Sequence, residues 1–246
     1  MSEFDGRVAL VSGGTKGIGR AIVEDLLGSG FKVVFGARTT ADVGELEKAL
    51  SARGEVMGVA ADVRDPEACA KLVEQAVHRF GGLDVLVNNA GVGRFAPLHE
   101  MSLEDWHVQI DTNLNGVFFF TRAAVPHLVR SSDAWIINIG SLAGRNPFAG
   151  GAAYNATKFG LLGMTEAMML DLRYEGIRVS LVMPGSVDTG FGGREAGEKS
   201  GWALTSEDVS RAVAMASAIR ASGNRCEIRA GPSTTPSRRY RKARGV

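Results

Sequence analysis

The chain has 246 residues, of which 45% are hydrophobic, and its 28 basic and 27 acidic side chains nearly balance. This balance argues against a general affinity for nucleic acids or membrane surfaces, and no apolar run approaches membrane-spanning length. The two cysteines and four histidines show no metal-ligand spacing, so we expect neither a metal site nor a disulfide framework. The N-terminus carries no signal-peptide pattern, so we expect a cytoplasmic protein.

Short apolar runs alternate with longer amphipathic runs along the chain. The short runs are rich in Val and Ile and almost continuously hydrophobic, which is typical of strands in a parallel sheet covered on both faces. We expect strands at 8–12, 32–37, 56–61, 84–88, 135–140, 178–183 and near 226–230. We expect helices between them, at 17–29, 42–53, 66–80, 103–129, 152–175 and 206–220. This alternation predicts an α/β fold, a single domain over 1–246 with a doubly wound parallel sheet and helices on both faces.

Two segments differ in composition from the rest. The segment 188–205 is rich in glycine and follows a predicted strand, so it is either a short substrate loop or a plain surface insertion. The tail 236–246 is strongly basic and shows no nucleic-acid motif, so we expect a solvated end and no nucleic-acid partner.

The stretch "VSGGTKGIGR" joins the first predicted strand to the first predicted helix. Gly13, Gly17 and Gly19 permit a tight turn, and they let the backbone approach phosphates at the helix N-terminus. Glycines at a helix start can also be simple turns. Their place between the first strand and the first helix favours a dinucleotide site.

The end of the second predicted strand bears on which dinucleotide is bound. NAD-binding sites usually place Asp or Glu there, whereas this chain has Ala37 followed by Arg38. The Arg38 guanidinium could bind a ribose 2′-phosphate, and Lys16 could add a second positive charge. Each alone could be a solvated cation. Together, and with no acid at 37, they favour NADPH over NADH.

Two more strand ends carry candidate cofactor contacts. Asp62 and Val63 follow the third predicted strand, where they could meet the adenine. The stretch "NNAG" follows the fourth, and the residues after its first asparagine would allow close approach to the cofactor; these are Asn89, Ala90 and Gly91. We expect Asn88 to be at least partly structural, because a buried asparagine can bond neighbouring strands.

With this glycine loop, "NNAG", Ser141, "YNATK" and "PGSVDTG" in that order, the chain resembles the short-chain dehydrogenase/reductase family over about residues 7–190. The resemblance implies a Rossmann-like domain of about seven strands in the order 3-2-1-4-5-6-7, usually assembled as a homotetramer or dimer. It also implies that catalysis rests on Asn113, Ser141, Tyr154 and Lys158, the last two of which also meet the cofactor. Further implied cofactor contacts are Gly13, Ile18, Asn89, Pro184, Gly185, Val187 and Thr189.

Tyr154 and Lys158 are four positions apart and so share one helix face. A tyrosine with an ordinary pKa near ~10 cannot readily act as both acid and base at neutral pH. A unit charge ~4 Å away at a dielectric of ~20 contributes about 4 kcal/mol, enough to lower that pKa to about 7. We therefore expect Lys158 to tune Tyr154 as general acid/base. Ser141 would donate to the substrate carbonyl, and Asn113 would anchor a water in the proton path.

The sequence thus predicts an NADPH-preferring oxidoreductase that interconverts a carbonyl and an alcohol. Candidate pocket residues suggest a mostly apolar ketone or aldehyde: Arg94, Phe95, Phe148, Met183, Phe191 and Trp202. The C-terminus lacks the "GQ…VDGG" ending of many fatty-acid-synthesis reductases, which argues against an acyl-carrier-protein substrate. The alternative is a non-catalytic NADP(H)-binding redox sensor or scaffold. The helices at 103–129 and 152–175 carry more apolar residues than one sheet face needs, so we expect a homo-oligomer, a tetramer or dimer.

Overall fold

The computed structural model describes residues 4–193, 197, 202–218 and 225–230. Its centre is a seven-stranded sheet in the order β3-β2-β1-β4-β5-β6-β7, and every neighbouring pair is parallel. The strands are β1 Val8–Ser12, β2 Lys32–Ala37, β3 Val56–Ala60, β4 Val85–Asn88, β5 Trp135–Ile139, β6 Arg178–Pro184 and β7 Arg225–Ala230. The predicted fold class and strand order are confirmed.

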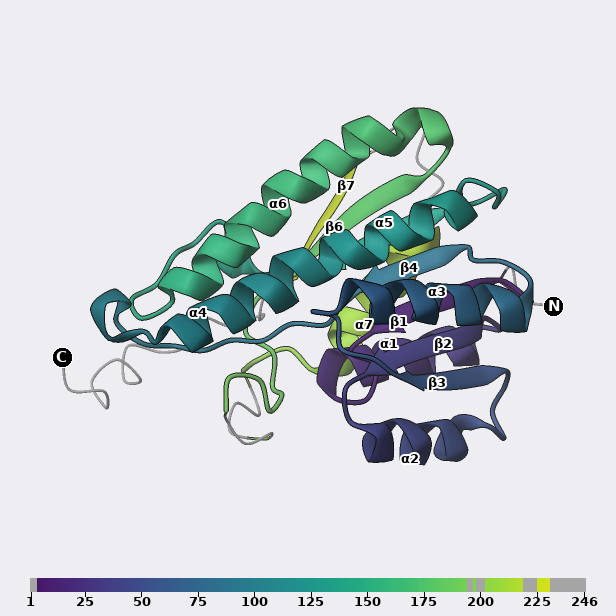
Figure 1. Cartoon of the computed structure of the whole chain (residues 1–246), viewed down its shortest axis with the longest axis horizontal. Coiled ribbons are helices and arrows are strands. Elements are labelled where there is room, and N and C mark those ends of the chain that lie inside the picture. Colours follow the sequence, from purple (N-terminus) through teal and green to yellow (C-terminus); the bar gives the residue numbers. More distant parts are fainter. Residues whose placement is uncertain (1–3, 194–196, 198–201, 219–224, 231–246) are drawn as a thin grey trace.

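Helices cover both faces of this sheet (Figure 1). One face carries α3 Pro66–Phe80, α5 Gly116–Leu128 and α6 Ala152–Leu172, and the other carries α1 Gly17–Gly28, α2 Thr40–Leu50 and α7 Ser206–Ala218. The alternation of side chains along a strand supplies both cores. In β1, Val8 and Leu10 pack beneath the first helix layer, whereas Ala9 and Val11 pack beneath the second.

The single helix predicted over 103–129 is divided in the structure. A π-helix at Asp111–Asn115 separates α4 Leu103–Ile110 from α5. The turn is wider by one residue, since the Gly116 N–H bonds the carbonyl of Asp111. A Cβ at Gly116 would lie 2.9 Å from Val63 Cγ2, so only glycine fits where this helix passes the loop after β3.

A side-chain hydrogen-bond cap closes the N-terminus of α3, and α1 has no such cap. Asp65 Oδ1 accepts from the backbone N–H groups of Glu67 and Ala68 at 2.9 and 3.2 Å, and Gly81 ends α3 with φ of +87°. At α1 no side chain caps the N-terminus and no acid stands in the first turn. The amide groups at the start of α1 thus remain available to an anion.

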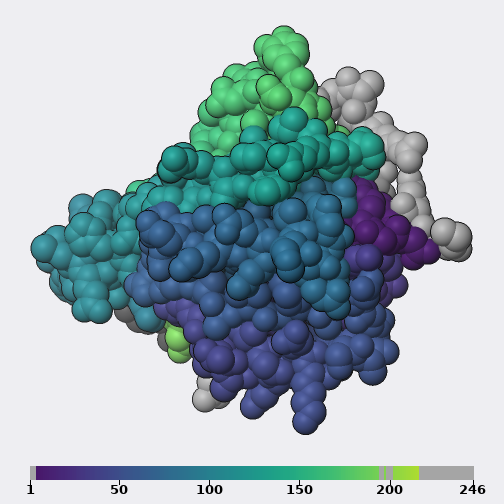
Figure 2. All heavy atoms as spheres, turned by 45° about the vertical axis from the view of Figure 1, so that its right-hand side comes forward, coloured from purple at the N-terminus to yellow at the C-terminus, as the bar shows by residue number. Residues whose placement is uncertain are grey.

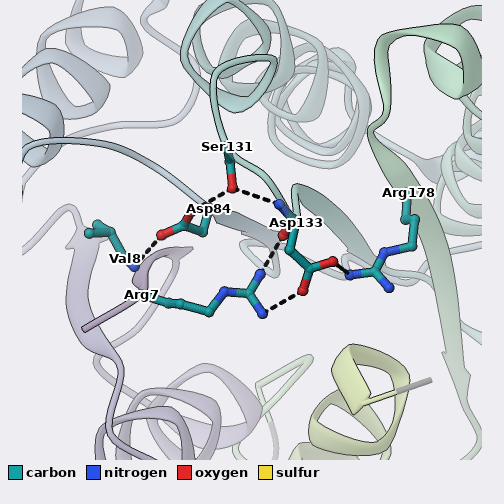
Figure 3. Close-up of polar contacts among 6 residues, drawn as sticks. All are labelled: Arg7, Val8, Asp84, Ser131, Asp133 and Arg178. Atoms are coloured by element: carbon teal, nitrogen blue, oxygen red, sulfur yellow. Dashed lines mark hydrogen bonds and ion pairs between the residues drawn. The ribbon is translucent and has the colours of Figure 1, made fainter. Parts of the chain in front are cut away.

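A polar cluster lies at the edge of the sheet where the strands begin (Figure 3). The Asp133 carboxylate bridges Arg7 and Arg178, and its Oδ2 lies 2.8 Å from Arg7 Nη1. Asp84 accepts from the backbone N–H of Val8 at 2.7 Å and from Ser131 Oγ at 2.5 Å. The cluster joins the starts of β1, β5 and β6 and the approach to β4. The candidate site lies at the opposite edge, where the strands end.

The segment that contains α4 projects at one end of the molecule in both views (Figures 1 and 2). Leu98 and Leu103, on this segment, are 67% and 77% exposed. Of the helices in the described ranges, none has the length and apolar character needed to cross a membrane.

Candidate active site

The glycine loop follows β1 at the carboxyl edge of the sheet. Gly13 has φ of +68°, and its N–H bonds the Gly36 carbonyl at 2.7 Å. A Cβ at Gly19 would lie only 2.0 Å from the Gly13 oxygen, so Gly19 serves close packing within the loop. Gly17, with φ of +52°, faces Thr189, since a Cβ there would lie 3.4 Å from Thr189 Cγ2. The loop and the segment after β6 are therefore neighbours.

The end of β4 holds this loop from beneath. The backbone N–H groups of Asn89 and Ala90 both donate to Ser12 Oγ, at 3.0 and 3.1 Å. Asn89 Nδ2 donates to the carbonyls of Ser12 and Gly13 at 2.9 and 3.1 Å. Asn89 thus fixes the shape of the glycine loop, a role that Ser12 shares through its hydroxyl.

Positive charge gathers at the ends of β2 and β3. Arg38 is exposed and helps to keep the pKa of the Asp62 carboxyl below its ordinary value, although hydrogen bonds from Arg64 do so most. Arg64 Nη2 lies 2.6 Å from Asp62 Oδ2. Lys16 Nζ lies 2.7 Å from Asp42 Oδ2, so its charge already has a partner. Lys16 and Arg64 are thus each paired with a carboxylate, and the expected contact of Lys16 with the cofactor stays a prediction; the sequence did not single out Arg64.

Ser141, Tyr154 and Lys158 lie together where β5 ends. Ser141 Oγ caps the short helix 142–144 by accepting from the Ala143 N–H at 3.1 Å, and it lies close enough to the Tyr154 hydroxyl to act against the rise in the pKa of that phenol. Lys158 Nζ donates to the Ile139 carbonyl at 2.9 Å and lies 5.8 Å from the centroid of the Tyr154 ring. Tyr154 and Lys158 are 9% and 6% exposed, so both are buried in the first turns of α6.

Burial governs the protonation of this pair. It raises the pKa of the Tyr154 phenol above 10, partly opposed by the hydrogen bond with Ser141. It also lowers the pKa of the Lys158 ammonium to about 8. The sequence predicted a Tyr154 pKa lowered by Lys158, and the structure gives the opposite direction. The ammonium is itself desolvated, and its hydrogen bond goes to the Ile139 carbonyl.

Asn113 is buried in the π-helix, with its side chain bonded on every side. Its Nδ2 donates to the Val92 carbonyl at 2.9 Å and to Thr157 Oγ1 at 3.0 Å, and its Oδ1 accepts from the Val92 N–H at 2.8 Å. Asn113 therefore ties the loop after β4 to α6. Its expected part in the proton path stays a prediction.

The remaining predicted site residues are spread around the same edge. Pro184 ends β6 and Gly185 follows it, and Val187 bridges to Leu204. Val63 is buried and packs against Gly116. Ile18 lies in the first turn of α1, and Gly91 is so close to Lys158 that a Cβ there would lie 3.9 Å from Nζ.

Of the candidate pocket residues, Phe95 and Phe191 pack against the Tyr154 ring, and Phe148 packs against Phe95. The ring centroids of Phe95 and Phe191 both lie 5.6 Å from that of Tyr154. Met183 is 1% exposed and belongs to the core, and Arg94 Nε lies 3.5 Å from Asp105 Oδ1 on α4. Part of the 188–205 loop (194–196 and 198–201) and the whole basic tail 236–246 lie outside the described residues.

Comparison with known proteins bears out the resemblance in the sequence. A family model described as short chain dehydrogenase matches residues 7–199. The chain belongs to this family. A protein assigned as the ketoacyl reductase of a monensin polyketide synthase, from Streptomyces virginiae, is 42% identical over 77% of this chain and 74% of its own. The 3-oxoacyl-[acyl-carrier-protein] reductase FabG of Escherichia coli is 37% identical over 76% of each chain.

Solved structures of oxidoreductases share the fold. An alcohol dehydrogenase from Thermococcus sibiricus, complexed with 5-hydroxy-NADP, has a TM-score of 0.86 and 27% identity, covering 94% of this chain and 98% of its own. A metagenomic short-chain oxidoreductase in complex with NADP has a TM-score of 0.82 and 35% identity, covering 95% of this chain and 100% of its own.

In this short-chain dehydrogenase, buried polar side chains position the site without reaching it. Asn88 Nδ2 donates to Asn138 Oδ1 at 2.9 Å and to Thr121 Oγ1 at 3.2 Å, which confirms the structural role expected for Asn88. Asn138 Nδ2 in turn donates to Thr165 Oγ1 on α6 at 2.9 Å. Asn155 Nδ2 donates to the Ala143 carbonyl at 2.7 Å. The position of Asn155 inside "YNATK" could have indicated its role from the sequence. No local pattern around Asn138 or Thr165 indicates theirs.

Among the described side chains, no group of His, Cys, Asp and Glu is arranged to hold a metal ion.

Proposed function

We propose that this short-chain dehydrogenase is an NADPH-preferring carbonyl reductase or alcohol dehydrogenase that uses Tyr154 as its general acid/base. The observation that carries the proposal is the meeting of the Ser141 hydroxyl, the Tyr154 phenol and the Lys158 ammonium at the carboxyl edge of the sheet. In doubly wound sheets, ligands bind at this edge.

The residues beside this group fit a dinucleotide with a 2′-phosphate. The N-terminus of α1 has no side-chain cap and no acidic residue in its first turn, so it favours a pyrophosphate. Arg38, at the end of β2, and Lys16, in the glycine loop, would bind the 2′-phosphate, and no carboxylate stands at Ala37. The two solved relatives in complex with NADP-type ligands support the same choice. A bound nicotinamide would supply the hydride, which no side chain of the protein can provide.

The protein's own groups would handle the proton. A raised pKa keeps the Tyr154 phenol protonated at neutral pH, so Tyr154 can donate its proton to the carbonyl oxygen as that oxygen becomes an alkoxide. Ser141 Oγ, which lies near the same phenol, would donate to that oxygen and hold it in place. Lys158, still largely protonated at pH 7 with a pKa of about 8, would stabilise the phenolate left behind.

Replacement of Tyr154 by phenylalanine tests the proposal. Tyr154→Phe keeps the ring packing but removes the proton donor, so turnover of NADPH with a panel of ketones and aldehydes should fall by about 10²–10⁴-fold. NADPH binding, followed by nucleotide fluorescence, should change by no more than a few-fold, because the glycine loop and Arg38 are untouched. Tyr174→Phe is the matched control, since Tyr174 is 83% exposed and should leave turnover as it is.

The rival function is a non-catalytic NADP(H)-binding redox sensor or scaffold. Such a protein needs the nucleotide site but has no use for Ser141 beside a buried Tyr154 and a buried Lys158, whose burial is energetically costly. NADPH binding without oxidation by any carbonyl compound would favour this rival. If the Tyr154→Phe variant is as active as its parent, Tyr154 is not the general acid.

Assembly and location stay predictions. We propose a homo-oligomer, a tetramer or dimer, through the helices of the 103–129 and 152–175 segments. Exposed apolar side chains on these helices support it, such as Phe118, Phe159 and Leu170, at 49%, 44% and 60% exposed. A monomeric mass by light scattering at micromolar concentration would contradict this. We also propose that the protein is cytoplasmic and that 188–205 serves as a short substrate loop.

A further inference from the structure

Three phenylalanines from three separate loops form a group of rings, two of which pack against Tyr154. Phe95 follows β4, Phe148 follows β5 and Phe191 follows β6. The Tyr154 ring lies edge-on to Phe95, with an interplanar angle of 78°, and tilted against Phe191, with both centroids 5.6 Å away. Phe148 continues the row, with its centroid 5.7 Å from that of Phe95. We call these three rings the aromatic wall.

The aromatic wall is packed on one side and open on the other. Phe95, Phe148 and Phe191 are 42%, 45% and 39% exposed. The residues that directly follow them are Ala or Gly, as in "RFAP", "PFAGG" and "GFGG". Exposed apolar surface of this kind, next to a candidate proton donor, is typical of a ligand site.

Glycines allow the rings to stand where they do. A Cβ at Gly93 would lie 2.6 Å from Phe191 Cε1 and 2.7 Å from Phe95 Cζ, so both rings rest on the backbone of Gly93. A Cβ at Gly151 would lie 2.5 Å from Phe148 Cε2. The ring positions therefore depend on close contact with bare backbone.

Hydrogen bonds join two of these loops to each other and to α6, and a further bond shapes the third loop. The Ala96 N–H bonds the Gly150 carbonyl at 3.0 Å, which joins the loop of Phe95 to that of Phe148. The Phe148 N–H bonds Asn155 Oδ1 on α6 at 3.3 Å, and the Phe191 N–H bonds Thr189 Oγ1 at 3.3 Å. Phe95 and Phe148 are thus held in place before any substrate arrives, which lowers the entropic cost of binding.

We propose that the aromatic wall receives the substituent beside the substrate carbonyl and selects carbonyl compounds that carry an aromatic or similarly flat unsaturated ring. This inference rests on the proposed function, because the carbonyl oxygen has to meet Ser141 and Tyr154 for its substituent to reach the wall. A flat ring gains edge-to-face contacts with the phenylalanines that a saturated ring or a linear acyl chain of equal area does not. Each such contact is worth about a 2- to 12-fold gain in binding.

Two ketones of nearly equal size test the proposal. Acetophenone and cyclohexyl methyl ketone differ in whether the ring is aromatic, and a 3-oxobutanoyl thioester of N-acetylcysteamine represents a linear acyl substrate. The quantity to measure is the ratio of kcat/KM for acetophenone to that for cyclohexyl methyl ketone, with NADPH, in the parent and in each variant. Comparing this ratio between proteins cancels the intrinsic difference in reactivity between the two ketones.

Phe95→Leu and Phe191→Leu keep an apolar side chain and remove the ring. Each should lower the acetophenone-to-cyclohexyl ratio by about 2- to 12-fold. Phe80→Leu is the control, because Phe80 ends α3, away from Tyr154, and should leave the ratio as in the parent. Circular dichroism and thermal unfolding check that all variants are folded.

The outcomes separate this inference from the function on which it rests. A ratio that neither wall variant lowers, in a parent that does reduce ketones, overturns the selective role of the aromatic wall alone. A parent that strongly prefers the linear thioester to acetophenone also overturns it. A parent that reduces none of the three compounds contradicts the proposed function, and the inference with it.

Discussion

Replacement of Lys158 by methionine should make the cofactor-free protein more stable while it inactivates the enzyme. Lys158 is 6% exposed, and its Nζ has a hydrogen bond to the Ile139 carbonyl. Methionine has a similar length and shape but no charge to desolvate. The substitution therefore removes the desolvation cost of the ammonium and keeps the packing of the aliphatic part of the side chain.

The size of the effect follows from the pKa. Lowering the pKa of Lys158 from 10.5 to about 8 corresponds to about 3 kcal/mol of lost stability. Below pH 8 the ammonium is charged in both folded and unfolded chains, so the full penalty applies. Between pH 8 and 10.5 the unfolded chain holds the proton and the folded chain does not, so stability rises with pH. Methionine leaves the Ile139 carbonyl without this donor, which costs about 1–2 kcal/mol of stability. Subtracting this cost from the penalty of about 3 kcal/mol leaves a net gain in the free energy of unfolding of about 1–2 kcal/mol at pH 7.

Thermal unfolding without cofactor measures this directly. At pH 7, Lys158→Met should raise Tm by about 2–8 °C, given roughly 2–4 °C per kcal/mol for a chain of this size. The difference should shrink between pH 8 and 10, where the parent gains stability. Lys71→Met is the control, because Lys71 is exposed on α3 and its replacement should change Tm little at either pH. A variant no more stable than the parent at pH 7, or a difference independent of pH, would refute the reasoning.

Three other substitutions probe the cofactor site and the two edges of the sheet. Ala37→Asp with Arg38→Ala should shift kcat/KM from NADPH toward NADH, because a carboxylate can accept from the ribose 2′-hydroxyl; equal use of both cofactors by the parent would contradict the assignment. Gly19→Ala places a Cβ 2.0 Å from the Gly13 backbone oxygen and should lower the free energy of unfolding in urea by about 1–3 kcal/mol. Gly44→Ala is the control, because a Cβ there meets no heavy atom within 4 Å and should leave that free energy unchanged. Asp133→Ala should destabilise by about 1–2 kcal/mol with kcat unchanged, and a fall in kcat would show coupling to the site.

Much of the fold and the site could be predicted because the signals are local. Parallel strands covered on both faces need short Val- and Ile-rich runs, and the chain shows them in order. In such a sheet all carboxyl ends meet at one edge, so residues after β1, β4 and β5 had to gather there. The spacing of Tyr154 and Lys158 by one helical turn needs no tertiary information either.

What the sequence missed depends on contacts between distant segments. The π-helix arises where the chain passes Val63, so the helical periodicity of 103–129 gave no sign of it. The hydrogen bonds from Asn88 through Asn138 to Thr165 link β4, β5 and α6, and each residue alone looks like an ordinary polar side chain. The raised pKa of Tyr154 is a matter of burial, which spacing along a helix does not reveal.

The two edges of the sheet divide the tasks of function and stability. The carboxyl edge holds a buried ammonium at Lys158, a buried phenol at Tyr154 and a glycine loop with positive φ at Gly13, and each of these works against folding. The edge where the strands begin holds the Arg7–Asp133–Arg178 bridge. This bridge joins β1, β5 and β6 at the side of the sheet opposite the candidate site. If this division holds, Lys158→Met and Asp133→Ala move Tm in opposite directions, and only the first changes turnover. Two variants that lower turnover alike would mean that the edges act as one unit.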